Sequence, residues 1–389
     1  MGARPRADRV RRAQANVLIA VTVLGAGMAG LAAAVRLREL GASPVVLEKG
    51  TRLGGSMLLS SCVVWRFREW EEYRAECPTG DERLQRLVWE RLDEAIEWLV
   101  SLGVPVVWDE TGNPRTVGKR LDPRGLTDAL VRRAGEIRVG QTWSDPSDQT
   151  DLTSWSDQTN AFILATGGFQ GSAEFVTRYI RPAGLLRLRA NPWSVGDGLR
   201  LGLERGAALS AGMDEFYGRN MPDVDLVESD FVPQAQLYGR FARVFNERGE
   251  EFFEGDVSWS ENDLVQATAR QPKARAWYVL DDDALAQHVR DRTVADLAAA
   301  APTATEPSEL PFDPPAGARI AVRVAPGITH TIGGLRIDDR ARVLHEDGTP
   351  IDGLFAAGAD VGGISTGGYA SGLAAALVFG RIAAESVVA

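Results

Sequence analysis

Three glycines and one glutamate near the start of the chain have the spacing of a dinucleotide-binding site. Gly25, Gly27 and Gly30 form a Gly-x-Gly-x-x-Gly pattern, and Glu48 ends the next apolar run. In such a site the first glycine makes a tight turn, the second lets a pyrophosphate approach the backbone, and the third lets the helix pack closely. The acidic residue binds a free ribose rather than a 2′-phosphate. A glycine-rich turn that only packs a helix does not require Glu48, so the sequence predicts FAD or NAD rather than NADP.

A second glycine-rich stretch, GADVGGISTGGYASGL at residues 358–373, directly precedes a helix pattern. Glycine at this density costs backbone entropy, and the usual reason for it is a ligand that approaches the main chain. The N-terminus of the following helix offers free N–H groups and a partial positive charge to such a ligand. Tyr369, within this stretch, adds a phenol that can donate a hydrogen bond.

The elements around these motifs predict an α/β fold with a parallel sheet. Apolar runs at 21–24 and 44–48 flank a helix pattern at 31–40, which Gly41 can end. Further apolar runs end at Thr166 and at Gly358, where the carboxyl ends of parallel strands would meet a cofactor. Residues 81–103 have Leu and Trp at helical spacing, which predicts a helix that packs on the core.

Length and composition exclude several classes of protein. The chain has 389 residues, 44% of them hydrophobic and 25% charged, which is enough for two globular domains. A net charge of −10 argues against nucleic acid or an anionic membrane as a partner. Cys62, Cys77 and three scattered histidines argue against iron–sulfur, haem and metal sites. This cysteine usage is typical of a reducing cytosol, and no apolar run predicts a membrane span, so we expect a cytoplasmic protein.

The N-terminus allows two interpretations. Arg11 and Arg12 precede an apolar run, as in a twin-arginine export signal, but no small-residue cleavage site follows. The apolar run leads straight into the first glycine motif. We therefore expect residues 1–16 to be a basic leader before the first strand.

Six motifs occur in order along the chain. They are GAGMAGLAAA with VVLEK, GGS, ILATGGFQG at 163–171, GDG at 196–198, THTIGG at 329–334 and GLFAAGADVGG at 353–363. With these motifs, residues 21–389 resemble the flavoprotein family of fumarate reductases and succinate dehydrogenases, near its tricarballylate and ketosteroid dehydrogenases. The resemblance implies a Rossmann-like FAD-binding domain at 17–213 and 326–389, and an inserted α+β cap at 214–325.

The resemblance also implies how FAD is held. The stretch at 358–373 would wrap the flavin ring, the last helix would point its N-terminus at the flavin, and Asp360 would hold the ribityl hydroxyls. No histidine lies in GGSMLLSSCVVW, where members with covalent FAD carry one, so we expect non-covalent FAD. The implied cofactor-binding residues are Gly25, Gly27, Met28, Ala29, Gly30, Glu48, Lys49, Gly54, Gly55, Ser56, Ser60, Ser61, Thr166, Gly167, Gly168, Asp197, Gly358, Asp360, Ser371, Gly372 and Leu373.

The catalytic groups of fumarate reductases are only partly matched. The resemblance places His330 at one substrate histidine, but Arg219 at the other. Leu285 takes the place of the arginine that delivers a proton, and Gly367 or Gly368 that of the arginine that clamps a carboxylate. Glycine cannot replace a bidentate, permanently charged arginine, so fumarate is not the expected substrate.

Tyr369, His330 and Arg219 remain as candidate catalytic residues. Ketosteroid dehydrogenases have a tyrosine in the equivalent glycine-rich stretch that binds a substrate carbonyl, and Tyr369 resembles it. Each candidate also has a purely structural interpretation. Tyr369 could pack against its surroundings with its hydroxyl bound to the backbone, His330 could be a loop histidine with local hydrogen bonds, and Arg219 could form an ion pair with a nearby carboxylate. Weaker candidates, from cap segments expected to face the flavin, are Tyr217, Tyr238 and Arg243.

These residues predict an FAD-dependent dehydrogenase or reductase. It would transfer hydride between flavin N5 and a carbon–carbon bond next to a carbonyl or carboxyl group of a small organic substrate. A flavin oxidase that uses oxygen, or a flavin-binding protein without redox turnover, are the alternatives. The sequence has no second dinucleotide motif, and it does not identify the electron donor or acceptor.

One segment departs from the family pattern. Residues 140–160, GQTWSDPSDQTDLTSWSDQTN, are polar and partly repeat themselves. This composition predicts a loop in place of the β-strands that family members have here.

Overall fold

The computed structural model describes residues 20–142, 161–180, 185–253, 256–258, 260–289 and 291–389. The basic leader and most of the polar segment 140–160 lie outside these residues. The central sheet has the order β16-β17-β7-β1-β2-β6. Its strands are β1 (Val21–Leu24), β2 (Val45–Glu48), β6 (Glu136–Val139), β7 (Ala161–Leu164), β16 (Arg342–Leu344) and β17 (Pro350–Ala356). All neighbours are parallel except β16 and β17, so the expected parallel α/β sheet is confirmed.

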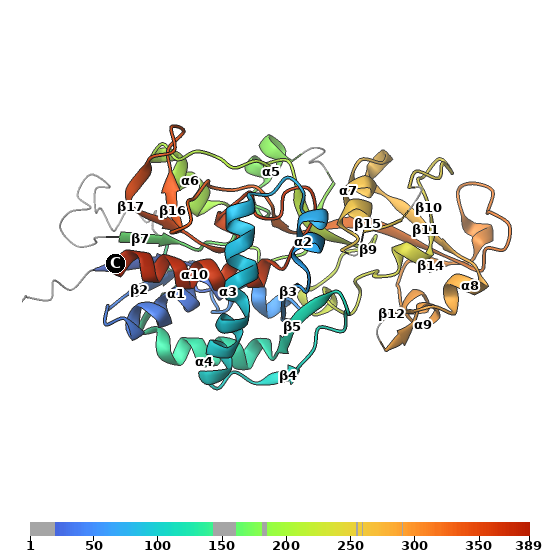
Figure 1. Cartoon of the computed structure of the whole chain (residues 1–389). Coiled ribbons are helices and arrows are strands. Elements are labelled where there is room, and N and C mark those ends of the chain that lie inside the picture. The colour runs from blue at the N-terminus through green and yellow to red at the C-terminus, as the bar shows by residue number, and fades with distance from the viewer. Residues whose placement is uncertain (1–19, 143–160, 181–184, 254–255, 259, 290) are drawn as a thin grey trace, which may run out of the picture.

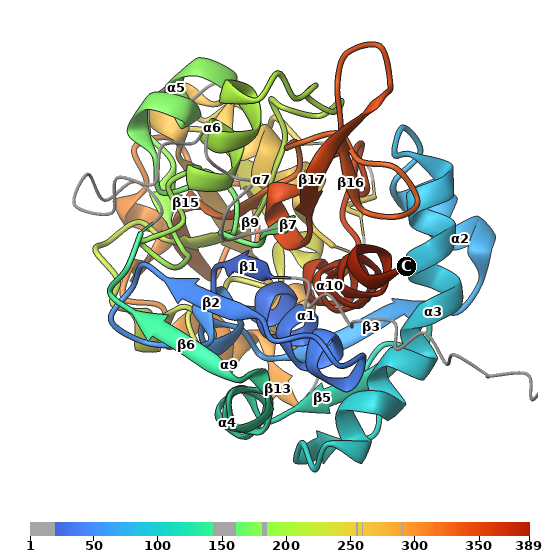
Figure 2. The same cartoon turned by 90° about the vertical axis from the view of Figure 1, so that its left-hand side faces the viewer.

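Two small-residue helices pack together against this sheet (Figure 2). They are α1 (Met28–Glu39), which follows the first glycine motif, and α10 (Gly372–Val388), which follows the second. Gly380 in α10 lies directly on the backbone of Ala29 in α1, since a Cβ on Gly380 would come within 2.4 Å of the Ala29 carbonyl oxygen. The start of α1 therefore packs against the middle of α10.

The remaining helices of this part surround α1 and α10. The predicted helix at 81–103 is α3 (Glu82–Ser101), begun by Asp81, whose carboxylate accepts from the N–H groups of Arg83 and Leu84. The others are α2 (Trp70–Glu76), α4 (Pro123–Ala134), α5 (Ala173–Tyr179) and α6 (Asp197–Glu204). A three-stranded sheet of order β3-β5-β4 lies beside them, made of β3 (Val63–Phe67), β4 (Val106–Trp108) and β5 (Thr116–Leu121).

A second sheet is built on one long strand, β15 (Ile320–Thr331). It has the order β10-β11-β15-β14, and β8 and β9 also pair with β15. In Figure 1 these elements, with α7 to α9, form the yellow and orange side of the molecule. The bounds are β8 (Arg187–Leu188), β9 (Phe216–Pro222), β10 (Arg243–Phe245), β11 (Ala276–Leu280), β14 (Ala304–Thr305), α7 (Asn262–Ala269), α8 (Asp282–Leu285) and α9 (Val294–Ala299), with a β12 (His288–Val289) and β13 (Arg292–Thr293) hairpin.

The boundary expected between cap and cofactor domain falls inside β15. The strand runs unbroken through residues 325 and 326, and β8, expected within the cofactor domain, pairs with it. Backbone hydrogen bonds therefore tie the two parts together.

The described residues also contain short 3₁₀ turns: Gly55–Leu59, Glu228–Asp230, Gly239–Phe241, Pro272–Ala274, Pro307–Glu309 and Gly358–Asp360. In the described part of the chain, no helix has the length and apolar character needed to cross a membrane.

The contact between α1 and α10 leads to a stability prediction. Gly380→Ala adds a methyl group that must push Ala29 away, and such overpacking costs about 1–3 kcal/mol. We expect the free energy of unfolding, measured by urea titration, to fall, even though alanine is the better helix former. Ser386→Ala, in the last turn of the same helix and half-buried, is the control and should not destabilise. A Gly380→Ala protein as stable as the wild type would show that the two helices have room between them.

Candidate functional site

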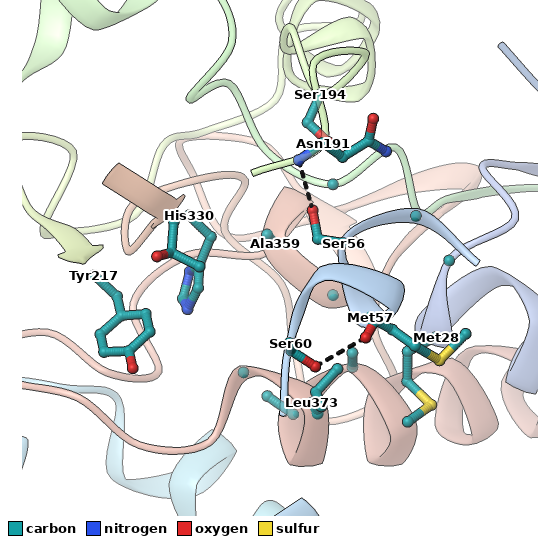
Figure 3. A pocket seen from close by; sticks show the side chains of 18 of the residues that line it. Met28, Ser56, Met57, Ser60, Asn191, Ser194, Tyr217, His330, Ala359 and Leu373 are labelled. Carbon is teal, nitrogen blue, oxygen red and sulfur yellow. Dashed lines mark hydrogen bonds between the residues drawn. The ribbon is translucent and has the colours of Figure 1, made fainter. Parts of the chain in front are cut away.

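A single cavity of about 670 Å³ connects the two glycine motifs with the second sheet. Its lining includes Gly27 from the first motif, Gly372 from the second, and Tyr217 and His330 from β9 and β15. Figure 3 shows Tyr217 and His330 on one side, and Ser56, Met28 and Leu373 on the other. Segments far apart in the sequence therefore share one internal surface.

The first glycine motif forms an open cradle at one end of the cavity. Gly27 is the N-cap of α1, and a Cβ placed on it would meet nothing within 4 Å. No side chain caps this helix, so its first N–H groups face the cavity. Gly25 has φ +103° and lies against the Ala165 carbonyl, and Gly30 lies against the Gly25 carbonyl. These close approaches leave space for a pyrophosphate in front of Gly27.

Glu48 is buried at the end of β2 and lines the same cradle. Its Oε2 accepts from the Ala26 N–H at 2.8 Å, and its Oε1 accepts from the Gly50 N–H at 2.6 Å. These bonds orient the carboxylate, and each oxygen keeps further acceptor capacity for ribose hydroxyls. The residues present therefore fit the adenosine part of a dinucleotide.

The second glycine motif brings another helix N-terminus to the cavity. Ser371 is the N-cap of α10, and its Oγ accepts from the Ala374 N–H at 3.3 Å. Gly372, the first residue of α10, lines the cavity together with Leu373. The partial positive charge at this helix end can stabilise negative charge on a bound group.

Asp360 does not have the position expected from the resemblance. Its buried carboxylate accepts from the Thr166 N–H, from Thr166 Oγ1 at 2.9 Å and from the Gly168 N–H at 3.5 Å. It is not among the residues that line the cavity. Burial raises the pKa of Asp360 to about 6, and these hydrogen bonds oppose the increase. Asp360 therefore ties the ends of β7 and β17 together, and the structure does not support direct contact with ribityl hydroxyls.

Four side chains form what we call the polar wall: Tyr217, Arg219, His330 and Tyr369. Tyr217 and His330 are cross-strand partners on β9 and β15, with ring centroids 5.4 Å apart. Tyr369 stacks on Tyr217 with a centroid distance of 3.4 Å and an interplanar angle of 9°. The Arg219 guanidinium carbon lies 5.4 Å from the Tyr217 ring centroid. All four line the cavity.

Tyr369 keeps its proton at neutral pH. Its oxygen accepts from the Gly372 N–H at 3.3 Å, at the start of α10. Burial raises the pKa of Tyr369 and the adjacent Tyr217 raises it further, while the Gly372 N–H and Arg219 act in the opposite direction. The phenol is therefore protonated and can donate a hydrogen bond.

His330 is a neutral acceptor. Its Nδ1 lies 2.9 Å from the Thr331 carbonyl oxygen, so Nδ1 must carry the hydrogen. Burial lowers the pKa of His330, and the bond to Thr331 only partly opposes this. Nε2 has no hydrogen-bond partner among the described residues. A Cβ on Gly372 would come within 3.0 Å of Nε2, so the glycine keeps space open beside its lone pair.

Arg219 provides the positive charge of the polar wall. One of its Nη atoms donates to the Ser260 carbonyl. Burial lowers the pKa of Arg219, but Tyr217 and Glu261 outweigh it, so the net shift is upward and the group stays charged. The carboxylate partners considered from the sequence, such as Asp214 and Glu215, form no ion pair with Arg219 in the described part of the chain.

Most of the candidate residues from the sequence share this cavity. Besides the polar wall, those that line it are Gly25, Gly27, Met28, Ala29, Glu48, Lys49, Gly55, Ser56, Ser60, Ser61, Thr166, Gly167, Asp197, Gly358, Ser371, Gly372 and Leu373. Four others lie outside the lining: Gly30, Gly54, Gly168 and Asp360. The three glycines in this second group pack against neighbouring atoms, so they support the cavity from behind.

Two of the weaker candidates lie elsewhere. Tyr238 lies in a turn, is fully buried in the core that includes residues of β11 and β15, and donates its hydroxyl hydrogen to Gln236. Arg243 is exposed and pairs with Glu251 at 2.6 Å. Leu285, which the resemblance placed at an active-site arginine, packs in the core of the second sheet instead. Sequence order alone did not show which cap residues face the cavity.

Several lining residues were not expected from the sequence. The Asn191 N–H donates to Ser56 Oγ at 3.3 Å, which joins the segment after β8 to the first motif (Figure 3). Arg189, Ser194 and Glu261 also line the cavity. They lie in irregular or strand-end segments without a motif, so no pattern marked them. The Cys62 thiol lines it too, and burial raises the pKa of Cys62 to about 12, so it is no thiolate nucleophile.

The described residues contain no group of three or more His, Cys, Asp or Glu side chains arranged to hold a metal. The described lining instead offers two helix N-termini, an acidic ribose acceptor and hydrogen-bonding side chains. A profile of the FAD binding domain family matches residues 20–141 and 120–373. The chain belongs to this family. Its cofactor is therefore FAD, which the open cradle at Gly27 and the position of Glu48 fit.

Relatives of this FAD protein include reductases. NADH:fumarate oxidoreductase of Klebsiella pneumoniae (strain 342) is 25% identical over 93% of this chain and 47% of the relative. Fumarate reductase (cytochrome) of Shewanella frigidimarina is 23% identical over 94% and 76%. Urocanate reductase of Eggerthella lenta is 25% identical over 95% and 74%. The chain thus spans about half the length of the first of these and about three quarters of the other two.

Solved structures have the same fold as this FAD protein. The open conformation of a flavocytochrome c3 fumarate reductase matches with a TM-score of 0.68 at 22% identity, covering 95% of this chain and 78% of that one. A 3-ketosteroid-delta4-(5alpha)-dehydrogenase from Rhodococcus jostii RHA1 matches with a TM-score of 0.68 at 19% identity, covering 95% and 97%. At these identities the likeness establishes the fold, and the chemistry has to be inferred from the site.

Glu48 leads to a prediction about cofactor affinity. Glu48→Gln replaces a carboxylate oxygen by an NH₂ group, which cannot accept from an N–H or a ribose hydroxyl. A lost charged hydrogen bond is worth about 1.5–3 kcal/mol, so we expect FAD affinity to fall about tenfold or more. FAD released by acid precipitation and titrated back into the protein gives this affinity.

The exposed Glu97→Gln is the matched control and should bind FAD as the wild type does. Unchanged affinity in Glu48→Gln would remove Glu48 from the ribose site. Yellow colour that stays with the acid-precipitated chain would refute non-covalent binding.

Proposed function

We propose that this protein is an FAD-dependent dehydrogenase or reductase of small organic molecules. It transfers hydride between flavin N5 and a carbon–carbon bond next to a carbonyl or carboxyl group, with a substrate other than fumarate. The observation that carries the proposal is the shared cavity: the FAD cradle lines one end, and the polar wall lines the same space. A site limited to binding FAD has no need for a donor, a neutral acceptor and a cation on one wall.

The polar wall supplies the groups that such a reaction needs. The bound FAD supplies the two-electron acceptor or donor. Tyr369, protonated and fixed by the Gly372 N–H, donates a hydrogen bond to the substrate carbonyl. Arg219 adds positive charge next to the same oxygen. His330, with a free lone pair on Nε2, accepts the proton from the carbon adjacent to the carbonyl, or returns it in the reverse direction.

Fumarate is disfavoured by the composition of the polar wall. Fumarate reductases, by the resemblance, have two substrate histidines. In the polar wall Arg219 takes the place of one of them, and His330 is the one histidine that remains. Leu285 no longer bears on this question, because it lies outside the cavity. Several relatives are named as fumarate reductases, so rapid reduction of fumarate by this protein would contradict the proposal directly.

The proposal is tested by anaerobic titration of the FAD-loaded protein. Saturated and α,β-unsaturated cyclic ketones and carboxylic acids are added to the oxidised or the dithionite-reduced protein, and the flavin spectrum is followed. We expect a member of the panel to bleach the oxidised flavin, or to restore the colour of the reduced flavin, without air. Colour that returns only with oxygen and peroxide release would indicate an oxidase. A flavin that no member changes would indicate binding without turnover.

Tyr369→Phe removes the proposed donor and keeps the ring. A hydrogen-bond donor aimed at developing negative charge typically accounts for about 10²–10³ in rate. We expect the rate of flavin reduction by substrate, measured by anaerobic stopped flow, to fall by about that factor with FAD content unchanged.

Tyr73→Phe is the matched control. Tyr73 is fully buried outside the cavity, and its hydroxyl has no hydrogen-bond partner among the described residues. A Tyr369→Phe rate within about threefold of the wild type would leave Tyr369 a packing role. Loss of FAD in this variant would mean that the phenol holds the cofactor site together.

A further inference from the structure

A second half-buried arginine, Arg189, lines the cavity next to the polar wall. It follows β8 directly, and its N–H donates to the Ile328 carbonyl of β15 at 2.9 Å. Arg219 lies on β9, which pairs with the same part of β15. Between them Gly327 has no side chain, and a Cβ there would come within 3.3 Å of Arg189 Cβ and 3.2 Å of the Arg219 carbonyl oxygen. Arg189 and Arg219 thus enter the same region of the cavity from the two segments that flank β15.

The guanidinium of Arg189 is held by neutral acceptors only. Its Nε and Nη2 donate to the Phe231 carbonyl at 3.0 and 2.5 Å, and its Nη1 donates to Thr329 Oγ1 at 3.0 Å. A guanidinium has five N–H donors. Three of these donors are used, and two remain that can donate to a carboxylate.

Neither arginine forms a salt bridge in the described part of the chain, although the charge of Glu261 stabilises that of Arg219. Within the described residues, no acidic side chain lies within 4 Å of the guanidinium nitrogens of Arg189 or Arg219. The nearest acidic group that lines the cavity in that region, Glu261, pairs with Arg240 at 3.6 Å. His330 is neutral and Tyr369 is protonated, so this end of the cavity carries excess positive charge.

The charge on Arg189 is retained at a cost. Burial lowers the pKa of Arg189 to about 10, and the charge of Arg219 acts in the same direction, whereas Tyr217 and Tyr369 oppose it. A group with this pKa is still protonated at neutral pH. A partly buried cation without a salt bridge is unfavourable, and an anion bound between the two arginines would offset both the desolvation and the repulsion.

We propose that Arg189 and Arg219 together bind a carboxylate group of the substrate. The inference rests on the proposed function for the nature of the reaction, and it adds the substrate class: an organic acid, not a neutral ketone. The carboxylate lies between the two guanidinium groups, and the remainder of the molecule extends along the polar wall toward the FAD cradle. Arg189 thereby determines specificity for an anionic substrate.

The test measures binding and requires no turnover. FAD-loaded protein is titrated with benzoate and 3-phenylpropanoate and with their uncharged amides, benzamide and 3-phenylpropanamide, and the change in the flavin spectrum gives each dissociation constant. We expect the wild type to bind at least one carboxylate about tenfold or more tightly than its amide. Arg189→Gln should weaken carboxylate binding by about 10- to 100-fold, leave amide binding unchanged and keep the FAD.

Arg187→Gln is the matched control, because Arg187 lies two residues earlier, on β8, and pairs with the buried Asp223. Arg189→Lys covers the case in which Arg189→Gln fails to fold, and it should keep the charge but lose part of the affinity, since lysine lacks the planar fork. Equal binding of carboxylate and amide by the wild type would overturn the proposal, as would an unchanged preference in Arg189→Gln.

The two proposals fail in different ways. Flavin bleaching by a neutral ketone together with no preference for carboxylates would refute the acid-binding role and leave the dehydrogenase or reductase intact. A clear preference for carboxylates that disappears in Arg189→Gln, with no bleaching by any substrate, would support the acid-binding role and refute the reaction.

Discussion

The close contact between α1 and α10 is the constraint on which the site depends. Gly380, in the middle of α10, lies on the backbone of Ala29 at the start of α1. Each helix begins at a glycine-rich turn that lines the cavity, with Gly27 capping α1 and Ser371 capping α10. Both helix N-termini thus contribute partial positive charge to the cavity, and α1 also contributes N–H groups without a side-chain cap. A larger side chain at Gly380 would push the start of α1 away from α10.

The strand β15 connects the FAD-binding fold to the polar wall. It runs from the second sheet to Thr331, and its neighbours β8 and β9 lead to Arg189 and Arg219. Tyr217 and His330 face one another across the β9–β15 pair. Because these positions are set by backbone hydrogen bonds, the polar side chains keep a fixed geometry relative to the two helix ends. Rigid elements are a more precise support for such a site than loops.

Burial then decides which chemical forms these side chains take. Removed from water, Tyr369 keeps its proton, His330 remains neutral, and Arg189 is charged but destabilised. The same wall therefore contains a donor, an acceptor and cations at neutral pH. Desolvation also strengthens the electrostatic effect of each group on a bound substrate.

The sequence by itself determined the FAD-binding fold and predicted a set of cofactor residues, most of which line the cavity. The turn at Gly25, the close approach at Gly27 and Gly30 and the acceptor at Glu48 depend on local backbone geometry, so a short pattern is enough to identify them. His330, Arg219 and Tyr369 were also found from motifs, and the structure places all three on one wall. Only the tertiary structure separated Tyr217, which lines the cavity, from Tyr238 and Arg243, which do not. Only the tertiary structure showed that Asp360 binds Thr166 and that Arg189 lies near Arg219. These placements depend on strand register and on pairing between distant segments, and a one-residue change in register reverses which side chains face a cavity, so local patterns cannot reveal them.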